Sequence, residues 1–347
     1  MIRIAFASLV SLAALAAALP ATAPASAAEF PLAKDTVAVG AVTTATTKYD
    51  DTMLDRARQY DDGYVDFMVA NPGVKPWLPG DGTAINIPNQ FILPDAPRTG
   101  IVINIAARLI FYYPPGGKTV EVYPTGVGVQ AGATPLGVTH VVRKEDGPVW
   151  IPPPSIRAER PDLPVAIYPG PDDPLGAYAL RLGWNNYLIH GTNKPDSVGR
   201  NVSHGCMHLY PEDIDRLFHE VPVGMQVRTV SQAVMAAWID GRLYIQVYPS
   251  KDQADEIDYN QPMTPKAPAE LMQRVAAAAG ERVDLVDWDA VQTAGLAASG
   301  IPTPVTPAVE DLQATASGDD TAGTATDAAP YNATTAAEQA AALEVTR

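Results

Sequence analysis

One cysteine and several histidines stand close together in the middle of this chain. Cys206 is the only cysteine among 347 residues, and three of the five histidines, His190, His204 and His208, lie in the same stretch. An imidazole beside a thiol lowers the thiol pKa from about 8.5 and orients its attack on a carbonyl carbon. These residue types therefore indicate acyl transfer through Cys206, with a histidine as the base.

The segments around these residues must bring thiol and imidazole together. Residues 187–190 and 205–209 are typical of short strands, and Cys206 follows His190 by sixteen residues. The ends of two adjacent strands can therefore place both groups at one site. Gly191 and Gly205 permit close approach of the backbone, and consecutive N–H groups around Gly205 would stabilise an oxyanion.

Two other interpretations fit the same residues. A lone cysteine is often a small buried apolar side chain without a chemical role. Alternate residues of a strand share one face, so Cys206 and the three histidines also resemble a set of zinc ligands. A single thiolate with no second cysteine disfavours zinc, and we expect neither a metal nor a cofactor.

The order of the motifs resembles a known family. His190-Gly191-Thr192 followed by Ser203-His204-Gly205-Cys206 is similar to the active-site signature of the L,D-transpeptidases of the YkuD/ErfK type. The likeness covers about residues 50–305 and resembles the periplasmic, Gram-negative branch. It includes the segments 133–137, 141–144, 150–153, 170–176, 179–183 and 210–214. One position departs, because the family usually has arginine where this chain has His208.

The resemblance implies a role for each residue of the motif. Cys206 would be the nucleophile and His190 the general base, oriented by a backbone carbonyl near Gly191 rather than by an acid. Ser203 would form a hydrogen bond within the motif, and His204 would orient the substrate. If His208 replaces a substrate-binding cation, its charge would depend on pH, since an unperturbed histidine has a pKa near 6.5.

The resemblance also implies substrates and inhibitors. The acyl donor would be a tetrapeptide stem of peptidoglycan: the thiolate attacks the third residue, D-Ala leaves, and an amine resolves the thioester. The acceptor would be the diaminopimelate of another stem, which gives a 3–3 crosslink, or a lysine of an outer-membrane lipoprotein. Carbapenems would acylate the same thiol. A cysteine peptidase of the NlpC/P60 kind and a non-catalytic wall-binding protein are the alternatives.

The first 28 residues are typical of a signal peptide. Arg3 precedes an apolar run over residues 4–19, and small residues follow at 25–28. This run is shorter than the ~20 residues that span a membrane, and no cysteine offers a lipid anchor. We therefore expect export to the periplasm. An unpaired thiol in that oxidising compartment is a liability unless it is used, which favours Cys206 as a nucleophile.

Residues 99–231 are expected to form the catalytic domain. Many short strands with Gly and Pro turns predict a mainly β fold, a sandwich or barrel-like domain with one or two short helices. The proline-rich segment 146–178 would form a rigid loop at the substrate cleft, carrying Trp150 and Tyr168. A helix is predicted over 211–220. Strands are predicted over 101–105, 108–113, 121–129, 139–143, 179–182, 187–190, 205–209, 226–230 and 243–248.

The flanking segments differ in composition from the catalytic region. We expect a mobile lead-in over residues 29–49, then a small LysM-like α+β module over 50–90, which either binds glycan or only packs against its neighbour. A C-terminal strand and helical extension should occupy 232–305, with helices at 268–279 and 288–294. Residues 306–347 are poor in large apolar side chains and are predicted to be disordered. The net charge of −15 argues against a nucleic-acid partner, and no pattern defines the oligomeric state.

Overall fold

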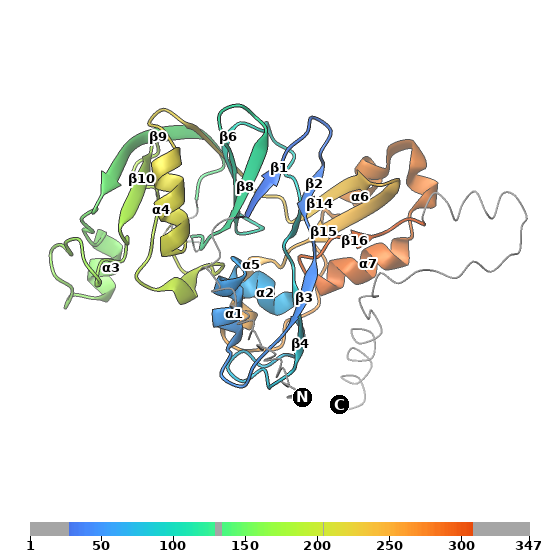
Figure 1. Cartoon of the computed structure of the whole chain (residues 1–347), viewed down its shortest axis with the longest axis horizontal. Helices are drawn as coiled ribbons and strands as arrows, with labels where there is room; N and C mark the ends of the chain where they lie inside the picture. The colour runs from blue at the N-terminus through green and yellow to red at the C-terminus, as the bar shows by residue number, and fades with distance from the viewer. Residues whose placement is uncertain (1–27, 129–133, 204, 308–347) are drawn as a thin grey trace, which may run out of the picture.

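The structure, a computed structural model, describes residues 28–128, 134–203 and 205–307. Figure 1 shows a β-rich body at the left and centre, an N-terminal module with helices α1 (Met53–Gln59) and α2 (Tyr64–Val69) below it, and a C-terminal extension at the right. The predicted signal peptide, apart from Ala28, and the predicted tail beyond residue 307 lie outside the described residues. Within these ranges, no helix is both long and apolar enough to cross a membrane.

A nine-stranded sheet forms the β-rich body. Most neighbouring strands are antiparallel, but β13 pairs with β6 and β12 pairs with β11 in parallel. Just after β8, Gly126 pairs with His208 of β12, so the two ends of the curled sheet meet and the predicted mainly β, barrel-like fold is confirmed. The strand order is β1 (Ala28–Pro31), β8 (Thr119–Pro124), β7 (Leu109–Tyr113), β6 (Gly100–Asn104), β13 (Gln226–Val230), β9 (Gly137–Asp146), β10 (Tyr178–Leu182), β11 (Leu188–His190) and β12 (Met207–His208).

Helix α4 (Pro211–Glu220) packs on this sheet, and its predicted bounds are confirmed. Ile214, Leu217 and the following Val221 are fully buried at helical spacing. They belong to a core that also contains side chains of β6, β7, β8, β9, β10, β11 and β12. This helix begins three residues after His208, so its packing supports the strand that carries the motif.

The N-terminal module has the order strand, helix, helix, strand. Strand β3 (Thr43–Thr46) pairs antiparallel with β4 (Ala84–Ile87), and the two helices lie between them in the sequence. Met53, Phe67 and Ile85 are almost completely buried in its small core. The side chain of Thr52 accepts a hydrogen bond from the backbone of Asp55 and caps α1.

The prediction of a mobile lead-in over residues 29–49 is wrong. This segment contributes β1 to the large sheet, β2 (Ala38–Gly40) to a ladder with β5 (Gln90–Ile92), and β3 to the N-terminal module. These strands are edge strands with half-exposed Thr and Ala side chains, so they lack the apolar alternation that predicts a strand. Their partners are distant in the sequence, and local composition does not reveal them.

The C-terminal extension contains both predicted helices, α6 (Leu271–Ala279) and α7 (Trp288–Ala297). They pack on a three-stranded sheet of β14 (Val234–Ile239), β15 (Arg242–Val247) and β16 (Thr303–Pro304). The sequence did not predict β14, β16 or helix α5 (Lys251–Asp258). Helix α5 begins with a capping box formed by Ser250 and Gln253. This pair is a sequence signal for a helix N-terminus and could have predicted α5.

Candidate active site

Three neighbouring strands carry the motif residues on one face. In β10 and β11, Ala179 lies opposite His190 and Arg181 lies opposite Leu188. In β11 and β12, His190 lies beside His208, and Ile189 lies beside Met207. Side chains alternate along a strand, so Leu180, Ile189 and Met207 enter the core while the other face carries the row Arg181, Leu188, Cys206, His190 and His208.

The His190 imidazole is held by its own backbone neighbour. Its Nδ1 lies 2.5 Å from the carbonyl oxygen of Gly191, so Nδ1 carries the proton and Nε2 is left as the acceptor. The expected orienting carbonyl near Gly191 is therefore present. Burial, and then the charge of His208, lower the His190 pKa to about 3, while the carbonyls of Gly191 and Leu175 favour the protonated ring. The ring is neutral near pH 7 and able to take a proton.

The Cys206 thiol is partly buried beside backbone groups of the preceding strand. Its Sγ lies 3.6 Å from the carbonyl oxygen of Asn186. Burial raises the pKa of the thiol, whereas a backbone hydrogen bond from Leu188 and the charge of Arg181 act in the opposite direction. The two groups thus rest as a thiol and a neutral imidazole, so a nucleophilic role of Cys206 would require transfer of the thiol proton to a base.

The turn before Cys206 is tied by two hydroxyl groups. The hydroxyl of Ser203 donates to the carbonyl of Cys206 at 2.5 Å and accepts from the backbone N–H of Gly205 at 3.2 Å, as expected for a hydrogen bond within the motif. Thr134 donates to the carbonyl of Gly205 at 2.8 Å. Gly205 has φ 117°, a conformation that favours glycine. Because its N–H is occupied, Gly205 is a poorer oxyanion donor than the sequence predicted.

Gly191 is required for close packing. A Cβ at this position would lie 2.9 Å from Ile214 of α4 and 3.3 Å from the carbonyl oxygen of Leu175. The residue after the base is therefore pressed between α4 and the end of the proline-rich segment. His204, predicted to orient the substrate, lies outside the described residues.

Comparison with known proteins agrees with this geometry. The YkuD family model, described as the L,D-transpeptidase catalytic domain, matches residues 98–229. The probable L,D-transpeptidase YcfS of Escherichia coli is 39% identical over 218 residues, which cover 60% of this chain and 68% of YcfS. The chain belongs to the L,D-transpeptidase family. The family resemblance of the sequence is thereby confirmed, whereas no comparison shows a LysM module.

Other L,D-transpeptidases are also similar. YbiS of Escherichia coli is 46% identical over 198 residues, which cover 55% of this chain and 64% of YbiS. ErfK/SrfK of the same organism is 44% identical over 183 residues, 51% of this chain and 59% of that protein. The matched region thus spans less than two thirds of these two relatives. A solved Enterococcus faecium L,D-transpeptidase domain acylated by ertapenem is 21% identical, with a TM-score of 0.31 over 40% of this chain and all of that chain.

His208, where the sequence resemblance leads us to expect arginine, is buried. Its ring lies 6.1 Å from the His190 ring, and its Nε2 lies 2.9 Å from the carbonyl oxygen of Ser197. Burial lowers the His208 pKa, which disfavours a protonated ring near pH 7, and a substrate-binding role for His208 stays a prediction. A Cβ at Gly126 would lie 1.9 Å from this ring, so only glycine leaves room for it. His208 is a positioning residue behind His190.

The two predicted cleft aromatics belong to the proline-rich segment and not to β10, β11 or β12. Tyr168 is 72% exposed, and Trp150 pairs through its backbone with Ile167. The proline-rich segment also contains an unpredicted helix, α3 (Pro154–Glu159). The part of the proline-rich segment that contacts the site is its C-terminal end: the backbone carbonyl of Leu175 raises the pKa of His190. A cleft role for Trp150 and Tyr168 stays a prediction.

Sequence reasoning overlooked Arg181. It lies in the row beside Leu188, its charge lowers the thiol pKa, and its Nε donates to Glu145 at 2.5 Å. Arg143 also contacts Glu145. Arg181 could have been found from side-chain alternation in β10. Residues 179 and 181 of this strand lie on the same face, and residue 179 lies opposite His190.

Proposed function

We propose that this protein is an exported L,D-transpeptidase that acts on the tetrapeptide stems of peptidoglycan. The observation that supports this most is the parallel pairing of β11 and β12, which puts Cys206 and His190 on one face while Ile189 and Met207 fill the core. Names of the relatives agree with this activity. The absence of an acid beside His190 is compensated by the Gly191 carbonyl.

In the proposed reaction the neutral His190 accepts the thiol proton at Nε2 as Sγ attacks the carbonyl carbon of the third stem residue. The carbonyls of Gly191 and Leu175 stabilise the imidazolium that forms. The tetrahedral intermediate expels D-Ala, whose amine takes the proton from His190, and a thioester of Cys206 remains. An acceptor amine then attacks the thioester, loses a proton to His190 and releases the thiol.

The acceptor is either the diaminopimelate side chain of a second stem or a lysine of an outer-membrane lipoprotein. The first gives a 3–3 crosslink and the second attaches the lipoprotein to the wall. Either reaction takes place in the periplasm. Incubating the protein with tetrapeptide muropeptides and with a lysine-ended peptide in competition separates the two by the mass of the product.

Acylation by a carbapenem tests the nucleophile directly. Intact mass spectrometry should show one carbapenem added to the native protein and none to Cys206→Ala. A product analysis that finds only hydrolysed stems, with no amine exchange, would replace transpeptidation by the peptidase alternative. Absence of both products and of acylation would leave a wall-binding protein without catalytic activity.

The N-terminal module supports a second part of the proposal, binding of glycan strands. Its order β3, α1, α2, β4 with two antiparallel strands matches the LysM-like pattern expected from the sequence, and β3 supplies the strand that the sequence did not reveal. Trp77 and Leu78, in the loop between α2 and β4, are 57% and 70% exposed. Trp77→Ala should reduce binding to purified sacculi without changing acylation of Cys206; unchanged binding would make the module a packing element.

A further inference from the structure

Two aspartates are buried together where the N-terminal module meets helix α4. Asp61, in the turn between α1 and α2, is 9% exposed, and Asp213, in the first turn of α4, is fully buried. The two carboxyls lie close enough to act on each other's pKa, and two buried carboxyls at such a separation share one proton. Within the described residues, none of their four oxygens has a donor with good hydrogen-bond geometry. Such a pair is costly to bury unless a cation balances it.

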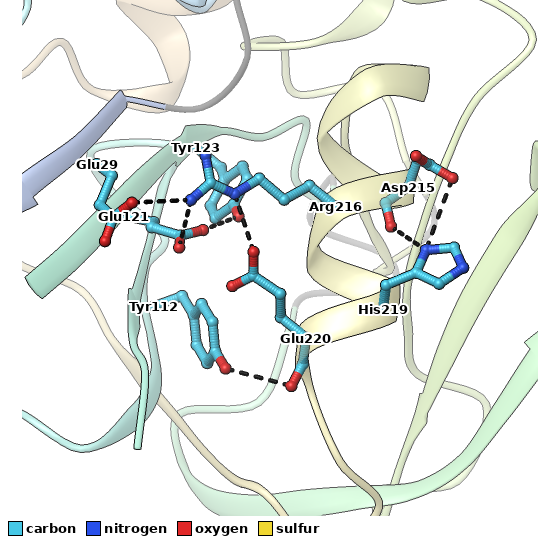
Figure 2. Close-up of polar contacts among 8 residues, drawn as sticks. All are labelled: Glu29, Tyr112, Glu121, Tyr123, Asp215, Arg216, His219 and Glu220. Atoms are coloured by element: carbon cyan, nitrogen blue, oxygen red, sulfur yellow. Dashed lines mark hydrogen bonds and ion pairs between the residues drawn. The ribbon is translucent and has the colours of Figure 1, made fainter. Parts of the chain in front are cut away.

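The cations near this pair already have acidic partners. Arg58 binds Glu212 through two hydrogen bonds of 2.9 Å. Figure 2 shows Arg216 of α4 reaching Glu29, Glu121 and Glu220. The other ionisable groups that act on the pair or its immediate neighbours are acids and phenols: Asp62, Tyr123 and Tyr210.

The start of strand β1 lies at this pair. Ala28 pairs with Val122 of β8, and Glu29 of the same strand contacts Arg216 at 3.3 Å. The backbone N–H of Ala28 lies near the Asp61 carboxyl and lowers its pKa, but it does not form a hydrogen bond of good geometry. In an unprocessed chain this nitrogen is a neutral amide with a single proton.

The sequence places a processing site directly before Ala28. Residues 25–27 are Ala, Ser and Ala, the small-x-small pattern that signal peptidases cut after. This cut lies one residue before the boundary of 1–28 expected from the sequence. We propose that cleavage after Ala27 turns the Ala28 nitrogen into an α-ammonium that binds Asp61 and Asp213 and fastens β1 and the N-terminal module to α4. This inference rests on the export proposed above.

The charges balance only in the processed chain. Two carboxyls sharing one proton carry a net charge of −1, and an α-ammonium with a pKa near 8 supplies +1. Ile214, the residue after Asp213, presses on Gly191 beside the catalytic base. Cleavage would therefore stabilise helix α4, which packs against the residue after His190, only once the chain has left the cytoplasm.

The unprocessed state has a distinct pH dependence. Burial raises the Asp61 pKa to about 7 when Ala28 is an amide, and the nearby Asp213 side chain and Ala28 N–H offset part of the rise. A carboxyl with a raised folded-state pKa contributes stability that is present at low pH and lost as pH rises through that value. Without the ammonium, stability should therefore fall between about pH 4 and 7 and change little above that range. With it, the fall should be much smaller.

The test compares the full chain starting at Ala28, released from a fusion without extra residues, with the same chain preceded by one glycine. We expect the glycine to lower Tm at pH 7.5 by about 5–10 °C, and by less at pH 5. In the Asp61→Asn/Asp213→Asn background the glycine should change Tm little, because the ammonium no longer has carboxylates to bind. Any loss that remains in this background measures the steric effect of the added residue. Equal Tm values for the first two proteins, or an equal loss in both backgrounds, would overturn the proposal.

Two measurements separate this inference from the proposed function. N-terminal sequencing of the exported protein should begin at Ala28, and any other start contradicts the inference. Carbapenem acylation of Cys206 is measured on the same samples. A normal Tm difference without acylation would overturn the transpeptidase proposal alone, and acylation without a Tm difference would overturn the ammonium site alone.

Discussion

Two buried polar regions of this protein differ in how their ionisable groups are stabilised. In the row of Arg181, Leu188, Cys206, His190 and His208, the reactive groups rest uncharged, and backbone carbonyls and N–H groups orient them. At the junction between the N-terminal module and the catalytic domain, four aspartates are almost fully buried: Asp61, Asp62, Asp66 and Asp213. The junction therefore depends on cations, whereas the active site depends on the backbone.

The difference shows what each region is sensitive to. A site built on backbone carbonyls keeps its geometry over a wide pH range, because carbonyls do not titrate. A junction built on buried acids holds only when each acid has a proton or a cation, and loses much stability when one partner is removed. Substitutions in the two regions should thus affect different measurements, activity in one and stability in the other.

The largest effect should come from Cys206→Ala. Loss of the thiol removes the nucleophile, and acylation by a carbapenem should fall below detection in intact mass spectrometry. Cys206 is away from the buried acids, so Tm should stay close to that of the native protein. Any acylated species formed by Cys206→Ala would show that another residue is the nucleophile.

His190→Ala should reduce the acylation rate by about 10²–10⁴-fold, the usual contribution of a positioned base. In the native protein the base has a pKa of about 3, so it stays deprotonated above about pH 4. The native rate should therefore show no acid-side inflection near pH 6.5. An inflection there that disappears in His190→Ala would mean that the ring is more solvated than its buried position implies.

Asp66→Asn should affect stability instead. The carboxylate of Asp66 in α2 lies 2.6 Å from Arg108, whose side chain is 2% exposed, so the substitution leaves a buried guanidinium without a counter-charge. We expect a loss of about 3–5 kcal/mol in the free energy of unfolding measured with urea. Asp162→Asn is the matched control, because its partner Arg160 is 61% exposed, and no measurable loss is expected. Similar values for the two variants would contradict the buried ion pair.

Gly126→Ala should damage the active site without removing any of its groups. The new methyl would overlap the His208 ring, which lies against the His190 ring, and the base would shift. We expect acylation to slow by about 10- to 100-fold, since displacements near 1 Å have effects of this size. Adding His208→Ala to Gly126→Ala should restore part of the rate by making space. No recovery in the double variant would argue against this route.

The smallest effect belongs to Arg58→Ala, also at the junction. Its partner is Glu212 at 2.9 Å, but the side chain of Arg58 is 43% exposed and water screens the pair. The free energy of unfolding should fall by less than about 1 kcal/mol, and the loss should shrink in 0.5 M salt. A loss comparable with that of Asp66→Asn would indicate that Arg58 also neutralises the buried aspartates.

The parts of the site that could be predicted lie within one short stretch of sequence. Residue types and spacing brought Cys206 and the histidines together, and the resemblance implied the Gly191 carbonyl and the Ser203 hydrogen bond. The helix Pro211–Glu220 follows from its first-turn residues. Arg181 was overlooked because its place depends on the pairing of β10 with β11. The burial of His208 depends likewise on Gly126, which is distant in the sequence.

The same reason explains the errors in the flanks. Strands β1, β2 and β3 have partners that lie 38 or more residues away, and none of the three has a run of alternating apolar residues. Asp61 and Asp213 come from different modules, so no local pattern indicates that they meet. Spacing predicts what neighbouring residues do together, but it cannot predict contacts that the fold alone creates.

The alternation in β11 and β12 also has an evolutionary consequence. Cys206 and Met207 are consecutive, yet they lie on opposite faces, with Met207 in the core, and His190 and Ile189 do the same. An inserted or deleted residue within either strand would exchange the two faces and bury the nucleophile. The loop between these strands can vary in length, whereas the strands can change only by substitution. Variation in this enzyme should therefore accumulate in residues 192–202 and leave the lengths of both strands untouched.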